Sequence, residues 1–373
     1  MHFFALIFIV MIAAVAVFLR YFIKRALETV GITIEKKRYK LILWASSVAV
    51  TVLMFSFVGY ALVVILHLAA LTAVLAVVNR IIRRVAGAKY ESGFAIWKKS
   101  YGLGIIPILI TAVIILLGYI NMNNVVETNY TIYTDKDIRE EGYRVAFIAD
   151  VHYGVSLDDE ALIEKCNEIS GKNADIVILG GDIVDNSTTP EGLETVFRAL
   201  GKIKNKYGIY YIYGNHDRSM RMMESDFTDD NLNRIIRENG IRILQDDVIE
   251  IGDDLTLIGR EDKSRNNRLS VAELLESADR EDFLLVADHQ PNQYKENGEA
   301  GTDLLLSGHT HGGQLFPVNL LMEIVPFNDG VYGEYTIGED SKAIVTSGFA
   351  AWSYPFKTAA PSEYMIIDIK GSK

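Results

Sequence analysis

The sequence predicts two parts of different fold class: an N-terminal α-helical transmembrane region of four spans, and a C-terminal α/β domain. Three observations lead to this prediction. The long uncharged apolar stretches of the 373-residue chain all lie within residues 1–120. This region carries 13 Lys and Arg against 3 Asp and Glu, a net +10, whereas residues 121–373 carry 24 against 45, a net −21. After residue 120, short apolar runs alternate with helical patterns, as in layered α/β domains.

The composition excludes several classes of protein. Half of the residues are hydrophobic and the mean hydropathy is +0.17, which excludes a disordered chain. The net charge of −11 argues against a nucleic-acid binder, which needs a basic face to displace counterions. The single cysteine, Cys166, excludes an intrachain disulfide framework and a cysteine-rich zinc module.

The membrane region contains four stretches that we expect to cross a bilayer. A spanning helix needs about 20 apolar residues, and the 38 uncharged residues of 41–78 are too many for one span. A turn near Gly59 divides them. The expected spans are about 3–20, 41–58, 61–79 and 103–120. The alternative for the first is a signal peptide, which is disfavoured because no positive segment precedes it and no small-residue cleavage site follows it.

Basic residues set the expected orientation. Segments 20–40 and 80–99 are rich in Lys and Arg, and such loops are typical of the cytoplasmic side. The N-terminus and everything after residue 120 are therefore expected outside the cytoplasm, in a multi-pass protein of the cell membrane. His67 lies within a span and is a functional candidate by default. A neutral His packed between helices is preferred, because the spans hold no second ionisable partner for it.

The α/β part is expected to comprise a linker and opening strand over 121–142 and a domain over 143–373. Apolar runs predict its strands, and apolar residues at helical spacing predict its helices. The strands expected are 144–149, 175–179, 209–213, 255–258, 283–287, 303–306, 343–346 and 364–369, and the helices are 157–170, 192–203 and 229–239. The late strands have no clear helices between them, which favours antiparallel pairs.

Polar, metal-competent side chains follow five of these apolar runs. All five histidines beyond residue 120 are among them. Ligands of α/β sheets bind outside the carboxyl ends of the strands, so we expect these residues to converge: Asp150, His152, Asp182, Asn215, His216, Asp217, His289, His309 and His311. One such histidine has an even chance of being structural, but five together favour a site.

The donor types indicate which metal the site holds. Imidazole, carboxylate and amide oxygen without thiolate suit Mn, Fe or Zn. A site of this size accommodates two ions, typically about 3.5–4 Å apart, with one carboxylate between them.

The five motifs IADVHYG, GGDIVD, GNHD, ADHQP and SGHTHGGQ resemble, in order and spacing, those of the calcineurin-like metallophosphoesterase family over about residues 140–370. The last two forms are similar to its membrane-associated subgroup, which includes UDP-diacylglucosamine pyrophosphatase-like enzymes and transmembrane proteins with a metallophosphoesterase domain. The resemblance implies a four-layer αββα sandwich and a two-metal site.

The resemblance also implies a role for each residue of the site. Asp150, His152 and His311 would hold the first metal, Asn215, His289 and His309 the second, and Asp182 would bridge them. His216 would protonate the leaving oxygen or stabilise the phosphoryl group, and Asp217 would orient His216 by accepting its ring N–H. Lys357 stands where the family more usually has Arg, which puts a substrate contact there in doubt.

The sequence thus predicts a membrane-anchored, dinuclear phosphoesterase, a phosphodiesterase for instance, in which metal-bound hydroxide attacks a phosphate ester or pyrophosphate. Manganese is one candidate metal, and the substrate is a phosphorylated small molecule or a lipid-linked phosphate. The alternatives are a metal-binding sensor on an inactive domain and a structural membrane protein.

Three further segments have two interpretations each. The basic segment 259–268 either faces an anionic substrate or is a solvated turn. The Met-rich segment 217–228 either forms a lid, touches lipid or packs on the domain. The apolar segment 315–327 either lies on the bilayer or is an ordinary loop.

Overall fold

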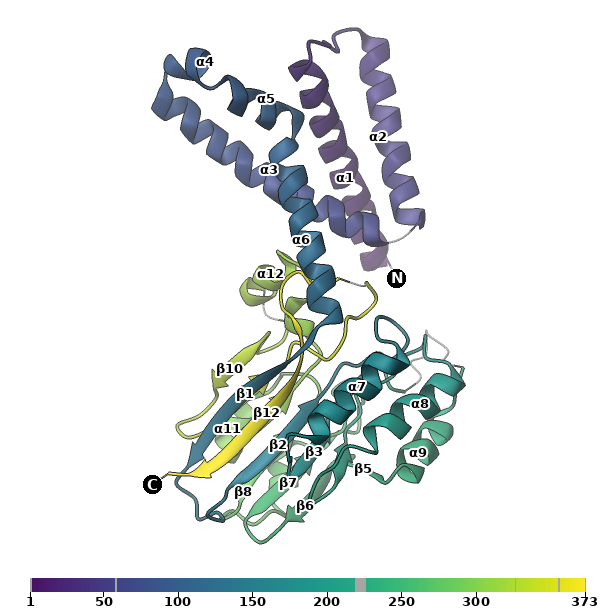
Figure 1. Cartoon of the computed structure of the whole chain (residues 1–373), viewed down its shortest axis with the longest axis vertical. Coiled ribbons are helices and arrows are strands. Elements are labelled where there is room, and N and C mark those ends of the chain that lie inside the picture. The colour runs from purple at the N-terminus through teal and green to yellow at the C-terminus, as the bar shows by residue number, and fades with distance from the viewer. Residues whose placement is uncertain (1, 58, 219–225, 326, 355, 373) are drawn as a thin grey trace. The chain divides into compact units, whose positions relative to one another are not determined.

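The computed structural model describes residues 2–57, 59–218, 226–325, 327–354 and 356–372 (Figure 1). The chain divides into two compact units, Met1–Leu117 and Gly118–Lys373. The Met-rich lid hypothesis depends on residues 219–225, which lie outside the described residues.

The regular elements among the described residues of the first unit are all helices. Its helices are α1 (His2–Thr29), α2 (Lys37–Phe57), α3 (Gly59–Ala86), α4 (Lys89–Gly93), α5 (Ala95–Leu103) and the greater part of α6 (Ile105–Asn123). α2 ends at Phe57 and α3 begins at Gly59, beside the expected turn. α1 and α3 continue as helices into the basic segments, because a helix satisfies its own backbone hydrogen bonds outside the bilayer as well as inside it.

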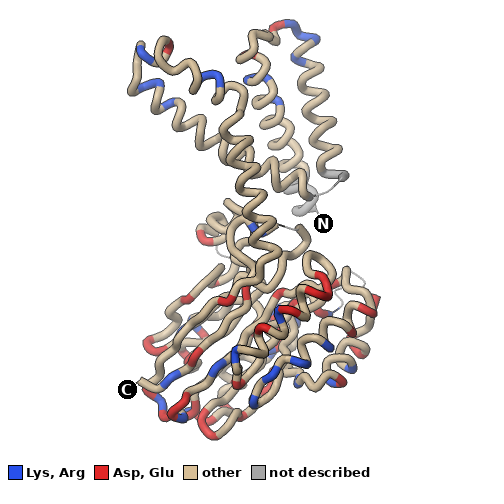
Figure 2. Tube along the Cα trace, in the orientation of Figure 1, with Lys and Arg blue, Asp and Glu red and all other residues tan. Residues whose placement is uncertain are grey.

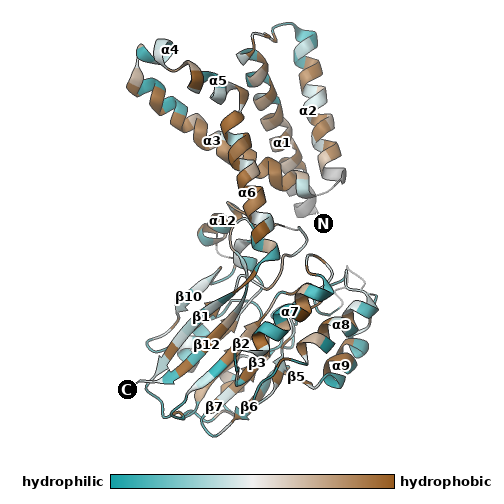
Figure 3. Cartoon of the chain, viewed as in Figure 1, coloured by the Kyte–Doolittle hydropathy of each residue, from teal (hydrophilic) through white to brown (hydrophobic). Residues whose placement is uncertain are grey.

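Two of these helices are long and apolar enough to cross a membrane, Tyr60–Ala86 and Ile105–Asn123. Only 22% of the most apolar window of each is buried within the protein, whereas a core helix of a soluble protein is mostly covered. Figure 3 shows the hydrophobic colouring of α3 and α6. They match the third and fourth expected spans, and α1 and α2 are long helices whose crossing of the membrane stays a prediction.

The two basic segments lie near one another within the helical unit (Figure 2). The guanidinium of Arg25, near the end of α1, lies 4.5 Å from the ring centroid of Tyr101 in α5. His67 is buried, and its Nδ1 lies 2.8 Å from the carbonyl oxygen of Val63 one turn earlier. This local partner agrees with a structural histidine.

The second unit contains two six-stranded sheets, which agrees with the expected α/β domain. The first sheet has the order β1 (Val125–Thr134), β12 (Ser362–Gly371), β2 (Tyr143–Ile148), β3 (Ile176–Leu179), β4 (Ile209–Tyr211), β5 (Ile241–Ile243). The second has the order β10 (Gly333–Thr336), β11 (Lys342–Val345), β9 (Leu304–Ser307), β8 (Phe283–Ala287), β7 (Leu255–Gly259), β6 (Asp247–Ile251).

The side chains of β2 show how the layers form. Val145 and Phe147 face the second sheet, and their alternates Ala146 and Ile148 face the helices. The helices on the outer face of the first sheet are α7 (Asp159–Ser170), α8 (Pro190–Leu200) and α9 (Asp229–Glu238), and those on the second are α10 (Val271–Leu275) and α11 (Tyr294–Ala300). Two short helical segments, η1 (His311–Gly313) and α12 (Val318–Ile324), follow β9. The domain is therefore a four-layer αββα sandwich (Figure 1).

The expectation of antiparallel late strands is wrong for the centre of the second sheet. β7, β8, β9 and β11 pair in parallel, and only the edge strands β6 and β10 pair antiparallel. The short helices α10 and α11 make parallel crossovers possible. They escaped the sequence analysis because each is seven residues or shorter.

An ion pair across the first sheet gives a pH-dependent prediction. Arg144 and Asp368 are register partners on β2 and β12, with Nε–Oδ1 2.7 Å and Nη2–Oδ2 3.0 Å. The hydrogen bonds from Arg144 lower the pKa of Asp368. The folded pKa is then below the unfolded value, so the pair stabilises fully above about pH 4 and loses its contribution as the pH falls through the folded pKa.

We therefore expect Asp368→Asn to lower the unfolding free energy by about 1 kcal/mol at neutral pH, because the pair is only partly shielded from water. The difference from wild type should shrink in acid. Melting of the detergent-solubilised chain against pH measures it, with the exposed Asp253→Asn as the control. An equal difference at acid and neutral pH would contradict the prediction.

Candidate metal centre

The strand ends of both sheets deliver their polar side chains to one place. Asp150 and His152 follow β2, Asp182 follows β3, and His289 follows β8. The remaining candidates follow β4 and β9: Asn215, His216, His309 and His311. Because parallel strands end at the same edge of a sheet, residues far apart in sequence become neighbours here.

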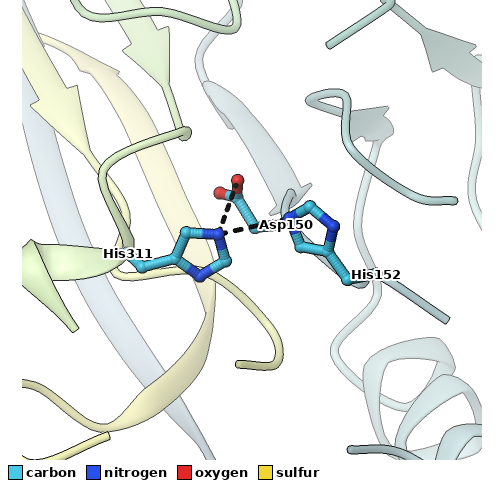
Figure 4. Close-up of side chains that lie close together, drawn as sticks. All are labelled: Asp150, His152 and His311. Carbon is cyan, nitrogen blue, oxygen red and sulfur yellow. Dashed lines mark hydrogen bonds and ion pairs between the residues drawn. The ribbon is translucent and has the colours of Figure 1, made fainter. Parts of the chain in front are cut away.

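One group that could hold a metal ion consists of Asp150, His152 and His311 (Figure 4). All three are buried. The Nε2 of His311 lies 3.2 Å from the Nε2 of His152 and 3.5 Å from Oδ1 of Asp150. Three donor atoms this close match the spacing of ligands around a cation bound at about 2.0–2.2 Å.

A second such group consists of Asp182, His289 and His309. The Oδ2 of Asp182 lies 3.1 Å from the Nε2 of His289 and 3.7 Å from the Nε2 of His152, which belongs to the first group. Asp182 therefore faces both groups. Asn215 lines one pocket together with members of both groups, and its buried Oδ1 has no hydrogen-bond partner among the described residues.

Three of the histidines have their outward ring nitrogen close to a protein oxygen. The Nδ1 of His289 lies 2.8 Å from the carbonyl oxygen of Gly180, and the Nδ1 of His311 lies 3.2 Å from that of Ala350. The Nδ1 of His152 lies 3.4 Å from Oδ2 of Asp185. An outward Nδ1–H leaves the Nε2 lone pair directed inward, as in metal-binding histidines.

Asp185 is a residue that the sequence analysis missed. It is the second carboxylate of the GGDIVD motif, and it is buried. The motif itself was the only signal available, because nothing in the sequence shows that the side chain turns toward His152.

Backbone strain is concentrated at the site. Five of the ten non-glycine residues with positive φ in the described chain are Asp150, His152, Asp182, His309 and His311. Such a conformation is uncommon and costs about 1–3 kcal/mol for each residue unless the surroundings impose it. Glycines make room nearby: a Cβ on Gly308 would lie 2.5 Å from Oδ2 of Asp150. The concentration of strain at these positions is typical of a functional site.

The protonation states suit a cation. Burial lowers the pKa of His309 to about 4 and that of His311 well below its ordinary value, so both rings are neutral and able to coordinate at neutral pH. Burial raises the pKa of Asp150 to about 6. Burial also acts against ionised Asp182, but the neighbouring His289 and His152 lower its pKa overall. Buried carboxylates of this kind need a positive partner.

His216 lies beside these groups rather than within them. Its ring centroid is 5.4 Å from that of His152 and 5.3 Å from that of Trp352. Its backbone N–H donates to Oδ1 of Asp182 at 2.7 Å. Trp352, which the sequence analysis did not select, thus covers one side of the His216 ring.

The expectation that Asp217 orients the ring of His216 is wrong. The carboxylate of Asp217 accepts four backbone N–H groups, from Gly214, Asp182, Ile183 and Val184, at 2.6–3.1 Å. It is fully buried. Asp217 therefore ties the turn after β4 to the turn after β3, and it positions the backbone that carries Asp182 and Asn215.

This arrangement predicts the behaviour of Asp217→Asn. An amide offers one acceptor oxygen where two accept now, and it turns an NH2 group toward backbone donors. We expect the unfolding free energy to fall by about 2–4 kcal/mol, because buried N–H groups lose their partner. Thermal melting measures it. His216→Ala is the matched control and should melt close to wild type. Equal melting temperatures for Asp217→Asn and wild type would refute this role.

The two groups open into a pocket of about 460 Å³. Its polar floor includes His152, Asp182, Asn215, His216, His309 and His311. Its wall is apolar and aromatic, with Leu315, Val318, Met322, Trp352 and Tyr354. Gln314 fixes part of this wall, since its Nε2 donates to the carbonyl oxygen of Trp352 at 2.9 Å.

Burial bears on two other points of the sequence analysis. Lys357 is buried and donates from Nζ to the carbonyl oxygens of Ser347 and Gly348, so it supports a loop and does not reach substrate. In the basic segment 259–268, Arg260 and Arg268 both pair with Asp288 behind the site. The charges of these two arginines are therefore paired within the protein, whereas Lys263 is exposed and Arg265 half-buried, so for them both interpretations of the segment remain.

Comparisons with known proteins show which proteins the chain is similar to. Residues 143–313 match the family model described as calcineurin-like phosphoesterase. The chain is 28% identical over 285 residues to a Campylobacter jejuni protein named as an uncharacterised metallophosphoesterase, and the match covers 74% of this chain and 73% of that one. It is 26% identical over 295 residues to a Danio rerio transmembrane protein with metallophosphoesterase domain, covering 74% of this chain and 64% of the relative.

A Helicobacter pylori metallophosphoesterase is 29% identical over 237 residues, and this match covers 62% of this chain and 60% of the relative. Among solved structures, the chain is similar to a dimetal phosphatase from Danio rerio, with 14% identity and a TM-score of 0.38 over 56% of this chain and 88% of that one.

Proposed function

The chain carries a calcineurin-like metallophosphoesterase domain over residues 143–313, and from this premise we propose that it is a membrane-anchored phosphohydrolase whose two candidate metal groups form one dinuclear centre. The observation that carries the proposal is the place of Asp182. Its carboxylate lies within 3.7 Å of His152 in the first group and 3.1 Å from His289 in the second. A carboxylate that faces two groups of ligands suits a bridge between two ions.

The residues present fit two divalent ions. Asp150, His152 and His311 would hold one, His289, His309 and Asn215 the other, and Asp182 both. The Oδ1 of Asn215 is buried and has no hydrogen-bond partner among the described residues, which supports its place as a ligand. Nitrogen and oxygen donors without thiolate suit Mn, Fe or Zn. Cys166 is buried in α7 as part of an apolar core cluster.

When bound, two such ions supply Lewis acidity to the phosphoryl group and lower the pKa of a water molecule. The other steps belong to the protein. In the proposed reaction water attacks phosphorus in line and releases one proton to solvent, the bond to the leaving oxygen breaks, and the protonated ring of His216 gives that oxygen a proton. Trp352 and Asp182 hold His216 at the pocket from two sides. Asp185 orients His152.

We place the catalytic domain outside the cytoplasm, on the far side of a four-span membrane region. The basic segments 20–40 and 80–99 support this orientation, since Lys and Arg collect on the cytoplasmic side. A cysteine at exposed position 269 should react with a membrane-impermeant maleimide in intact cells. Labelling only after the cells are broken would place the domain inside.

The proposal predicts metal-dependent hydrolysis of phosphate esters. Chelation should abolish turnover and lower the melting temperature of the purified chain, because bound ions stabilise the folded state. Readdition of Mn²⁺, Fe²⁺ or Zn²⁺ should restore both. An aryl monoester, an aryl diester, a nucleotide sugar and a phospholipid should be compared as substrates. Metal binding without turnover of any of them would favour the alternative, a metal-binding sensor.

A further inference from the structure

Five of the seven residues of helix α12 are apolar, yet none of its residues is buried. Leu320, Leu321 and Ile324 are 50%, 57% and 74% exposed, and Phe327 just beyond it is 79% exposed. Large exposed apolar groups in one short segment indicate a surface that meets a partner.

The two faces of α12 have different surroundings. Val318 and Met322, one turn apart, line the pocket above the metal groups. Leu320, Leu321 and Ile324 are not among the residues that line it. The same helix therefore forms a wall of the pocket and presents an apolar surface outward.

A chain of contacts connects this segment to the end of α6. The backbone N–H of Phe316 donates to Oγ1 of Thr358 at 2.9 Å. Lys357 precedes Thr358, and its backbone N–H donates to the carbonyl oxygen of Gly118 at 3.1 Å. The side-chain Nδ2 of Asn121 donates in turn to the carbonyl oxygen of Lys357. Gly118 and Asn121 belong to the last turns of α6, the apolar helix Ile105–Asn123. Figure 1 shows α12 at the same end of the sheets as the junction of α6 and β1.

We propose that the α12 segment, residues 315–325 and 327, is seated in the surface of the bilayer that α6 crosses. The contacts hold its start beside the end of a helix fit to span, so lipid is the partner within its reach. Its single charge is Glu323. Trp352 and Tyr354 stand at the pocket beside it, and these are the residue types enriched where membrane meets water.

The proposal deepens the proposed function and rests on it for one consequence. A pocket walled by Val318, Met322 and Trp352 that opens at the lipid surface takes an amphiphilic phosphate. The phosphate lies over the metal groups, and the apolar part leaves along α12 into the bilayer. The substrate class is then a phosphate carried on a lipid.

Depth measurement tests the membrane contact without any activity. Leu321→Cys in the full chain is labelled with an environment-sensitive maleimide dye and reconstituted into phosphatidylcholine nanodiscs. Burial raises the pKa of the native Cys166 thiol to about 12, so that residue does not compete for the label. Leu269→Cys, at a 42% exposed leucine of the same domain, is the matched control.

We expect the dye at position 321 to shift its emission to the blue and to lose most of its intensity to lipids that carry a quencher in their acyl chains. The dye at position 269 should show neither effect. Water-like emission at 321 would overturn the proposal. So would a shifted emission that lipid quenchers leave intact, because that result indicates protein, including a second copy of the chain, as the partner.

Activity then tests the substrate class. Leu321→Glu combined with Ile324→Glu should lower turnover of a phospholipid in nanodiscs about tenfold or more, since charges resist entry into the bilayer. The same variant should hydrolyse a soluble aryl phosphate like wild type. Equal losses on both substrates would overturn the lipid class and leave the metal centre standing. No turnover of either by the wild type would instead refute the proposed function.

Discussion

His216→Ala should lower turnover of an aryl phosphate by about 10²–10⁴-fold while the chain keeps its metal ions, because the side chain gives a proton and holds no ion. Its ring lies beside His152 and Trp352 at the pocket and takes no place in either group of candidate ligands. The two measurements are kcat and the metal content by elemental analysis.

The comparison with a candidate ligand makes this result specific. Asn215→Ala, one residue earlier, should lower turnover and metal content together. A leaving group of low pKa, such as a nitrophenolate, should reduce the defect of His216→Ala, since such an oxygen departs without a proton. Turnover like that of wild type in His216→Ala, on a substrate with a poor leaving group, would remove it from the mechanism.

Asp182→Ala should lower turnover by about 10³-fold or more and, unlike His216→Ala, should also lose metal from both groups. Removal of a ligand shared by two ions weakens both, and such ions supply several kcal/mol of transition-state stabilisation. The substitution also leaves the backbone N–H of His216 without its acceptor. Metal content and turnover should be measured on the same preparation.

Asp185→Asn provides a graded control for that experiment. Asp185 lies 3.4 Å from the outward nitrogen of His152, so its loss should weaken metal affinity or turnover by about 10–100-fold. Asp150→Ala should remove metal chiefly from the first group. Two ions per chain in Asp182→Ala would contradict the bridging role.

Much of the fold could be predicted from the sequence because its signals are local. Long uncharged stretches predicted the helices α1, α2, α3 and α6, although not the short α4 and α5, and the apolar runs before Asp150, Asp182 and His289 predicted the central strands. The strands β5, β6 and β10 were missed. They are short edge or near-edge strands with exposed positions, so no sustained apolar run marks them. The parallel centre of the second sheet was missed because α10 and α11 are too short to show a helical period.

The sequence by itself determined which types of side chain come together at the candidate metal centre. Strand ends carry histidine, aspartate and asparagine, and the rules of parallel sheets bring strand ends together. Only the tertiary structure decided what each side chain does there. Asp182 and Asp217 are both buried aspartates after strands, yet the carboxylate of Asp182 faces His152 and His289 and that of Asp217 accepts from four backbone N–H groups. The charged groups of Lys357 and Arg260 bind partners inside the protein, the carbonyl oxygen of Gly348 and the carboxylate of Asp288. The physical reason is that a side chain's type is local, whereas its partners come from segments that only folding brings near.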